Sequence, residues 1–217
     1  MHDSGADAVL TELYYLPSLA FFVHVQSFEQ IVFEVQENYP KQTYRNRCYI
    51  RTANKVQALT IPVAKGRSRK VKLKDVRISY AERWQNNHWR AIKSAYGKSP
   101  FFDFFADDYH DILYTKYEFL VDLNITLLSK CLDLLKWHDK QVVLSESYMK
   151  NAESQYVDQR GLYDLKSSPP GAEWGSGTSY QQVFGKDFVP NLSVIDLLFC
   201  EGANANLIIR QSSPSSR

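Results

Sequence analysis

The sequence predicts a single domain of mixed α and β structure, in which an N-terminal sheet of about five short strands packs against helices that begin near Trp84. Three observations support this class. The chain has 217 residues, 44% of them hydrophobic and 14% aromatic, which is enough for one packed core. Its first third alternates short segments rich in β-branched and aromatic residues with polar turns. From Trp84 onward, apolar residues recur at spacings of three and four, the period of an amphipathic helix.

The strand-like segments lie mostly in the first third of the chain. They are Leu10–Leu16, Gln30–Val35, Tyr44–Thr52, Val56–Val63 and Val76–Ser79, with a later strand expected at Val142–Met149. The aromatic run after Pro17 predicts a short helix. The segment Lys65–Lys74 is basic and contains Gly and Ser, so we interpret it as a loop. Either it is a solvated loop tip or it binds an anionic group of a substrate.

Three helices are expected after these strands. The first buries a face formed by Trp84, His88, Ala91, Ile92 and Ala95. The second is expected to be capped by Ser99, with Pro100 at its first position. The third carries an apolar stripe of Leu120, Leu123, Leu127, Leu128, Cys131, Leu134 and Leu135. Such continuous apolar faces are typical of helices that pack on a core.

The C-terminal part is expected to hold a loop and a short helix. Ser167–Thr178 is dense in Pro, Gly and Ser, which indicates a loop. Asn191 or Ser193 is expected to cap the helix that follows. The last residues contain nothing apolar to bury. We therefore expect a flexible N-terminus at residues 1–10, a single domain at residues 11–209 and a disordered tail at residues 210–217.

Charge and composition exclude several classes of protein. The 26 Lys and Arg residues nearly balance the 24 Asp and Glu residues, so no nucleic-acid partner is expected. The first ten residues are acidic where a secretory signal is basic, and no apolar stretch approaches the ~20 residues that span a bilayer. A cytoplasmic, not membrane-spanning protein is expected. Cys48, Cys131 and Cys200 share no CxxC spacing, which predicts reduced, buried thiols.

The motifs of common enzyme classes are absent from the sequence. There is no GxGxxG, GxxxxGK[ST], HExxH or GxSxG. His2, His24, His110 and His138 share no ligand spacing with one another, so no metal site is predicted. The sequence indicates no particular cofactor and no oligomeric state.

The first candidate site lies around Arg45, Asn46 and Arg47, with Gln36 shortly before it. Two guanidiniums beside a carboxamide can hold carboxylate or phosphate oxygens while the amide binds a hydroxyl group. In a strand, Arg45 and Arg47 would lie opposite Asn46, so one pocket for all three would need a loop or a bulge. The alternative is a charged surface segment.

The second candidate is His88, with Trp84 one turn before it and Tyr96 further along the same helix. A partly buried imidazole beside an indole suits a general base near neutral pH if this helix lines a cleft. Tyr96 would lie about 80° around the helix and border the same cleft. The alternative is a core histidine hydrogen-bonded to a backbone carbonyl.

The third candidate is Asp196, which stands among apolar residues in the segment Asn191–Phe199. Two interpretations remain open. The carboxylate is either exposed or buried in a pair with an arginine such as Arg47, with a structural or a functional role.

Taken together, these segments resemble the WbqC-like family. The shared motifs run in the family's order from about Glu12 to Gly202, and their order and spacing make the resemblance specific. They are Tyr15-Leu16-Pro17, Val35-Gln36, Lys41-Gln42, Tyr44-Arg45-Asn46-Arg47, Thr60-Ile61-Pro62, Trp84 with His88, Ala95-Tyr96, Pro100-Phe101-Phe102, and Asn191–Phe199 with Gly202. The chain departs from the family pattern at Glu12-Leu13, where many members have Gln-Pro, at Glu34 in place of Asp, and at Tyr44 in place of Trp. If the Gln takes part in binding, Glu12 alters what is bound.

The resemblance implies a role in the biosynthesis of bacterial surface polysaccharides such as O-antigen, and transfer of glycine or another aminoacyl group to a sugar has been suggested for some members. We therefore predict a transferase that moves an acyl or aminoacyl group onto a nucleotide-linked sugar, with His88 as the base. The expected partner is a sugar nucleotide or another small anionic substrate. The alternative is a non-catalytic protein that binds a sugar nucleotide or organises partner enzymes. The residues predicted to bind substrate are Gln36, Arg45, Asn46, Arg47, Trp84, Tyr96 and Asp196.

Overall fold

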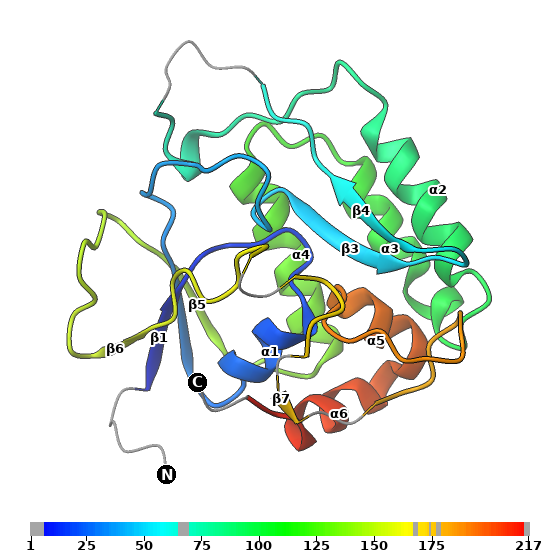
Figure 1. Cartoon of the computed structure of the whole chain (residues 1–217). Helices are drawn as coiled ribbons and strands as arrows, with labels where there is room; N and C mark the ends of the chain where they lie inside the picture. Colours follow the sequence, from blue (N-terminus) through cyan, green and yellow to red (C-terminus); the bar gives the residue numbers. More distant parts are fainter. Residues whose placement is uncertain (1–6, 65–69, 167–168, 174, 177–178, 215–217) are drawn as a thin grey trace.

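The main sheet of the protein has four parallel strands in the order β5-β2-β1-β6. The computed structural model describes residues 7–64, 70–166, 169–173, 175–176 and 179–214. Helix α1 (Leu19–Val25) connects β1 to its parallel neighbour β2, which a tight hairpin cannot do. Figure 1 shows this sheet at one side of the molecule. Its strands are β1 (Ala8–Thr11), β2 (Gln30–Phe33), β5 (Gln141–Leu144) and β6 (Tyr156–Asp158).

A separate antiparallel hairpin lies on the other side of the molecule, in front of α2 and α3 in Figure 1. It consists of β3 (Arg47–Arg51) and β4 (Val56–Thr60). Two very short strands, β7 (Gly175–Ser176) and β8 (Ser213–Pro214), also pair antiparallel. Single 3-10 turns are η1 (Leu73–Asp75) and η2 (Gly202–Asn204).

The mixed α and β class and the single domain are confirmed, and the strands are distributed differently than expected. The N-terminal strands divide between two sheets, and β5 and β6, which follow the helices, complete the parallel one. All four residues of β1 are buried, as in a strand covered on both faces, whereas β3 alternates between buried and half-buried residues. The expected strand at Val76–Ser79 makes isolated bridges, such as that between Ile78 and Val63.

The expected helices are present, and their apolar faces are buried. After α1 they are α2 (Trp84–Tyr96), α3 (Phe102–Tyr114), α4 (Leu120–Leu134) and α5 (Val194–Glu201). A further helix, α6 (Ala205–Gln211), was not predicted from the sequence. Helix α5 contacts all five other α-helices and β3, and its first seven residues are buried. The hydrophobic core is therefore centred on α5.

Two predicted caps differ in the structure. The Ser99 hydroxyl donates to the Tyr96 carbonyl at the end of α2, and α3 begins only at Phe102. Ser193 stands at the N-cap position of α5, but its hydroxyl donates to the Leu16 carbonyl. Both hydroxyls thus bond to a backbone carbonyl and do not cap the helix that follows.

The ordered elements extend slightly past the expected domain of residues 11–209, because Ala8 already pairs with Gln30 and Tyr156, and α6 ends at Gln211. Some residues lie outside the part of the chain that the structure describes: 1–6, 215–217, and parts of the expected loops at Lys65–Lys74 and Ser167–Thr178.

All three cysteines are buried and form no disulfide, as expected. In the described part of the chain, no helix combines the length and the apolar character that crossing a membrane requires.

Candidate functional site at the carboxyl edge of the parallel sheet

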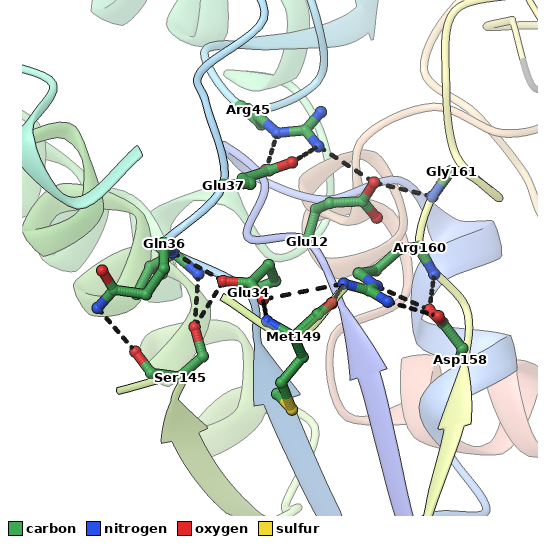
Figure 2. A network of polar contacts seen from close by, with 11 residues as sticks. Glu12, Glu34, Gln36, Glu37, Arg45, Ser145, Met149, Asp158, Arg160 and Gly161 are labelled. Carbon is green, nitrogen blue, oxygen red and sulfur yellow. Dashed lines mark hydrogen bonds and ion pairs between the residues drawn. The ribbon is translucent and has the colours of Figure 1, made fainter. Parts of the chain in front are cut away.

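Polar side chains stand at the carboxyl ends of all four parallel strands. Glu12 follows β1, Glu34 follows β2, Ser145 follows β5, and Asp158 ends β6. The carboxyl ends of parallel strands meet at one edge of a sheet, which is the usual place for ligands in such sheets. Figure 2 shows these four residues gathered there with Arg45 and Arg160.

Glu34 is the most buried member, with no exposed side-chain surface. One carboxylate oxygen accepts from the backbone amide of Gln36 at 2.8 Å and from the Ser145 hydroxyl at 2.7 Å. The other accepts from the Met149 amide at 3.0 Å and lies 3.8 Å from Arg160. Glu34 therefore ties β2 to the segment 145–149 that follows β5.

Two other carboxylates of the cluster, those of Glu12 and Glu37, form ion pairs with Arg45. Its guanidinium donates to Glu12 at 3.1 Å and to both carboxylate oxygens of Glu37. Glu12 also accepts from the Tyr14 hydroxyl at 2.6 Å and from the Gly161 amide at 2.8 Å. Burial raises the pKa of Glu37, and its bonds to Arg45 oppose this shift.

A cavity of about 460 Å³ opens beside this cluster, within the usual range of roughly 300–1,000 Å³ for small-molecule sites. Its lining residues are Gln36, Glu37, Asn38, Lys72 and Tyr148. The Gln36 side chain is held in place, since it donates to the Ser145 carbonyl at 3.1 Å and accepts from Lys72 at 3.2 Å. The cavity offers an ammonium group, a carboxylate, two carboxamides and a phenol ring to a ligand.

Two of the predicted site residues, Gln36 and Arg45, belong to this cluster. Residues 44–46 form a turn before β3, so the loop that a shared pocket would need is present. The side chains of Asn46 and Arg47 nevertheless bond outside this cluster. The Asn46 side-chain amide donates to the Ile61 carbonyl, and the Arg47 guanidinium donates to the Thr60 hydroxyl. Asn46 and Arg47 therefore hold the end of β4.

His88 lies in the core beside the same end of β4. One ring nitrogen is 3.1 Å from the Thr60 carbonyl and the other is 2.9 Å from the Tyr15 hydroxyl. Burial lowers the pKa of His88 to about 4, so the ring is neutral at pH 7 and donates to the carbonyl while it accepts from Tyr15. Its role as a catalytic base stays a prediction, and its contacts match the alternative of a core histidine.

The indole of Trp84 packs edge-on against His88, with 5.1 Å between the ring centroids. Its Nε1 atom and the Asn46 side-chain oxygen are buried without a hydrogen-bond partner among the described residues. Unpaired polar atoms of this kind are uncommon in folded proteins.

Asp196 is buried, which excludes the exposed alternative. Its carboxylate accepts from Tyr96 at 2.8 Å, from Tyr180 at 2.7 Å and from Gln182 at 2.8 Å. Burial raises the pKa of Asp196, and these three donors oppose the shift. Tyr96 and Asp196 are thus brought together within the core. Hydroxyl and amide groups bond the carboxylate in place of Arg47, the arginine named in the second alternative, and the charge of Arg51 acts on it through space.

The sequence prediction of the site omitted Glu37, Ser145 and Tyr148, and it noted Glu34 only as a departure from the family pattern. Lys72 entered it only as part of the basic segment Lys65–Lys74, with anion binding as one of two interpretations. The available signal was a polar residue directly after a short apolar strand, which occurs at Glu12, Glu34 and Ser145. Among the described residues, no group of three or more His, Cys, Asp or Glu side chains could hold a metal ion.

Comparisons with known proteins agree with the sequence motifs. The model of the WbqC-like protein family matches residues 13–166 and 172–208. An uncharacterised protein of Mycobacterium tuberculosis, Rv1507c, is 26% identical over 215 residues, which cover 88% of this chain and 92% of that protein. No solved structure is significantly similar to the chain.

Proposed function

We infer a function from the fact that this chain belongs to the WbqC-like protein family and from the cavity at the carboxyl edge of its parallel sheet. We propose that the cavity binds a sugar nucleotide or a similar small anionic substrate, and that the protein is a transferase of surface-polysaccharide precursor biosynthesis. It would move an acyl or aminoacyl group onto the sugar.

The polar lining of the cavity is the observation that carries this proposal. The Lys72 ammonium suits a phosphate oxygen, and the carboxamides of Gln36 and Asn38 suit sugar hydroxyls. The Tyr148 side chain is 57% exposed and offers an aromatic face to a sugar ring. Lys72 belongs to the basic segment Lys65–Lys74, for which an anion-binding role was one of two interpretations.

Acyl transfer requires a group that accepts the proton of the attacking hydroxyl or amine. Two residues are candidates for this base. His88 is predicted from the sequence, but both of its nitrogens are bonded within the core. Glu37 lines the cavity, and the elevation of its pKa by burial strengthens it as a base. The geometry therefore favours Glu37.

The first prediction concerns Lys72. Calorimetric titration with UDP-, dTDP- and GDP-linked sugars should show binding of at least one, weakened by about tenfold or more in Lys72→Ala, because a charge-assisted hydrogen bond is lost. Lys74→Ala is the matched control, since Lys74 is also exposed and lies two residues away. Unchanged affinity in Lys72→Ala would exclude the cavity as the binding site.

A non-catalytic binding protein is the second candidate, and one observation favours it. The Ser145 hydroxyl, beside the cavity residue Gln36, is not free to act as a nucleophile, because it donates to Glu34 and accepts from the backbone amide of Val35. Mass spectrometry of the bound sugar nucleotide after incubation with acyl-CoA and aminoacyl donors separates the two functions. A transferase adds the mass of the acyl group, and a binding protein leaves the sugar nucleotide unchanged.

A further inference from the structure

The charged cluster at the carboxyl edge is not balanced. Among the described residues, its ion pairs join the four carboxylates of Glu12, Glu34, Glu37 and Asp158 to the two guanidiniums of Arg45 and Arg160. Arg160 lies between Asp158 and Glu34. The side of the cluster next to Arg45 therefore keeps an excess of negative charge.

Glu37 is the carboxylate of this cluster that reaches the cavity. Its side chain is 17% exposed, and each oxygen holds one bond from Arg45 and retains capacity to accept another. The charges of Glu12 and Glu34 act on Glu37 through space and add to the effect of burial in raising its pKa. A cationic group at Glu37 would relieve this repulsion, whereas a neutral hydroxyl would not.

Lys72 gives the same cavity a positive group. A ligand that pairs with both Glu37 and Lys72 must carry an ammonium group for the carboxylate and an anionic group for the lysine. The carboxamides of Gln36 and Asn38 and the ring of Tyr148 add contacts for a polyhydroxylated ring between them. These requirements are met together by an amino sugar that carries a phosphate.

We propose that the cavity selects a phosphorylated amino sugar, whose ammonium group binds the Glu37 carboxylate and whose phosphate binds Lys72. This inference rests on the proposed function, because it presumes that the cavity binds a sugar with an anionic group. It adds that the sugar position facing Glu37 bears a free amine and not a hydroxyl or an acylated nitrogen. In the proposed transfer, the Glu37 carboxylate takes a proton from this ammonium group, and the resulting amine attacks the acyl carbonyl of an acyl-CoA or aminoacyl ester donor. The C–N bond forms as the bond to the donor's thiol or hydroxyl group breaks, and that group leaves with a proton.

The test is calorimetric titration of the full chain with glucosamine 1-phosphate, glucose 1-phosphate and N-acetylglucosamine 1-phosphate. These probes share the ring and the phosphate, lack a nucleobase, and differ only in the group at one carbon. Glucosamine 1-phosphate should bind at least tenfold more tightly than the other two. Because this comparison uses the unmodified protein, it does not depend on whether any variant folds.

Glu37→Gln should abolish the preference while the three sugar phosphates still bind, and Lys72→Ala should weaken all three. Glu146→Gln is the charge-matched control, since Glu146 is exposed and does not line the cavity, and it should keep the preference. Equal affinities for the three probes would overturn the amine inference and leave the proposed site intact. Absence of binding by all three, in a protein that binds a nucleotide-linked sugar, would overturn the amine inference alone, whereas absence of binding by the nucleotide-linked sugars as well would overturn the proposed function too.

Discussion

Glu34 is tolerated in the interior because each carboxylate oxygen has two partners. The Gln36 amide and the Ser145 hydroxyl bond one oxygen, and the Met149 amide and Arg160 meet the other. A buried carboxylate without such partners is strongly destabilising. Because Tyr148 lies between the two anchored residues Ser145 and Met149, the same bonds position one wall of the cavity.

Replacement of Glu34 by glutamine should therefore destabilise the fold. The new amide group would face the Met149 amide and Arg160, so donors would meet donors, at a cost of about 1–3 kcal/mol. Urea unfolding measures the loss. Glu146→Gln, an exposed change in the same segment, should leave the free energy of unfolding nearly unchanged. Equal stability of the two variants would contradict the role assigned to Glu34.

The stability of the protein should depend on pH through His88. Its pKa is lowered to about 4 in the folded protein, whereas an unfolded chain has about 6.5. Between these values the unfolded state binds the proton and the folded state does not, so acidification destabilises the fold. From pH 7 to pH 5 this contribution is about 2 kcal/mol.

Urea unfolding at pH 7, 6 and 5 tests this dependence. His88→Gln should lower stability at pH 7 but reduce the slope with pH, because the titrating group is gone. His138→Gln, at an exposed position, should keep the wild-type slope. If wild type and His88→Gln lose stability in parallel, the ring is protonated or exposed in the folded protein.

At the scale of elements, α5 lies at the centre of the hydrophobic core, where it contacts all the other α-helices. Leu198 in α5 is fully buried, and Leu207 in the neighbouring helix α6 is 52% exposed. Leu198→Ala should cost about 2–5 kcal/mol of unfolding free energy, because it removes buried methyl groups and leaves a cavity. Leu207→Ala makes the same chemical change at the surface and should cost much less. Similar losses would mean that α5 is not central to the core.

The helices were predictable because their signals are local. The face of Trp84, His88 and Ile92 repeats at helical spacing, and burial follows from that pattern alone. The strands were predictable as segments but not as a sheet. Nothing in β1 or β2 specifies that their other neighbours are β6 and β5, which follow more than a hundred residues later. Strand pairing depends on tertiary contacts that a single sequence does not reveal.

At the scale of the whole molecule, the cavity and its supporting cluster combine segments that are distant in the chain. Gly161 donates to Glu12 across 149 residues, and Ser145 donates to Glu34 across 111. Gln36 and Arg45 were found from the sequence because two arginines beside a carboxamide stood close together in it, and both residues also lie within family motifs. Lys72 stood out only as part of a basic segment with two open interpretations, and Tyr148 carried no signal, so their place together at the cavity follows from the fold.

The pairing of β1 with β6 also determines when the sheet can form while the protein is being synthesised. The first strand leaves the ribosome more than a hundred residues before Tyr156–Asp158, so the sheet cannot be completed until those residues have emerged. Helix α5 comes later still. Contacts at such separation also slow folding. During translation, Glu12 and Glu34 therefore lack the partners that bond them in the folded protein until the segment from Ser145 to Gly161 has emerged.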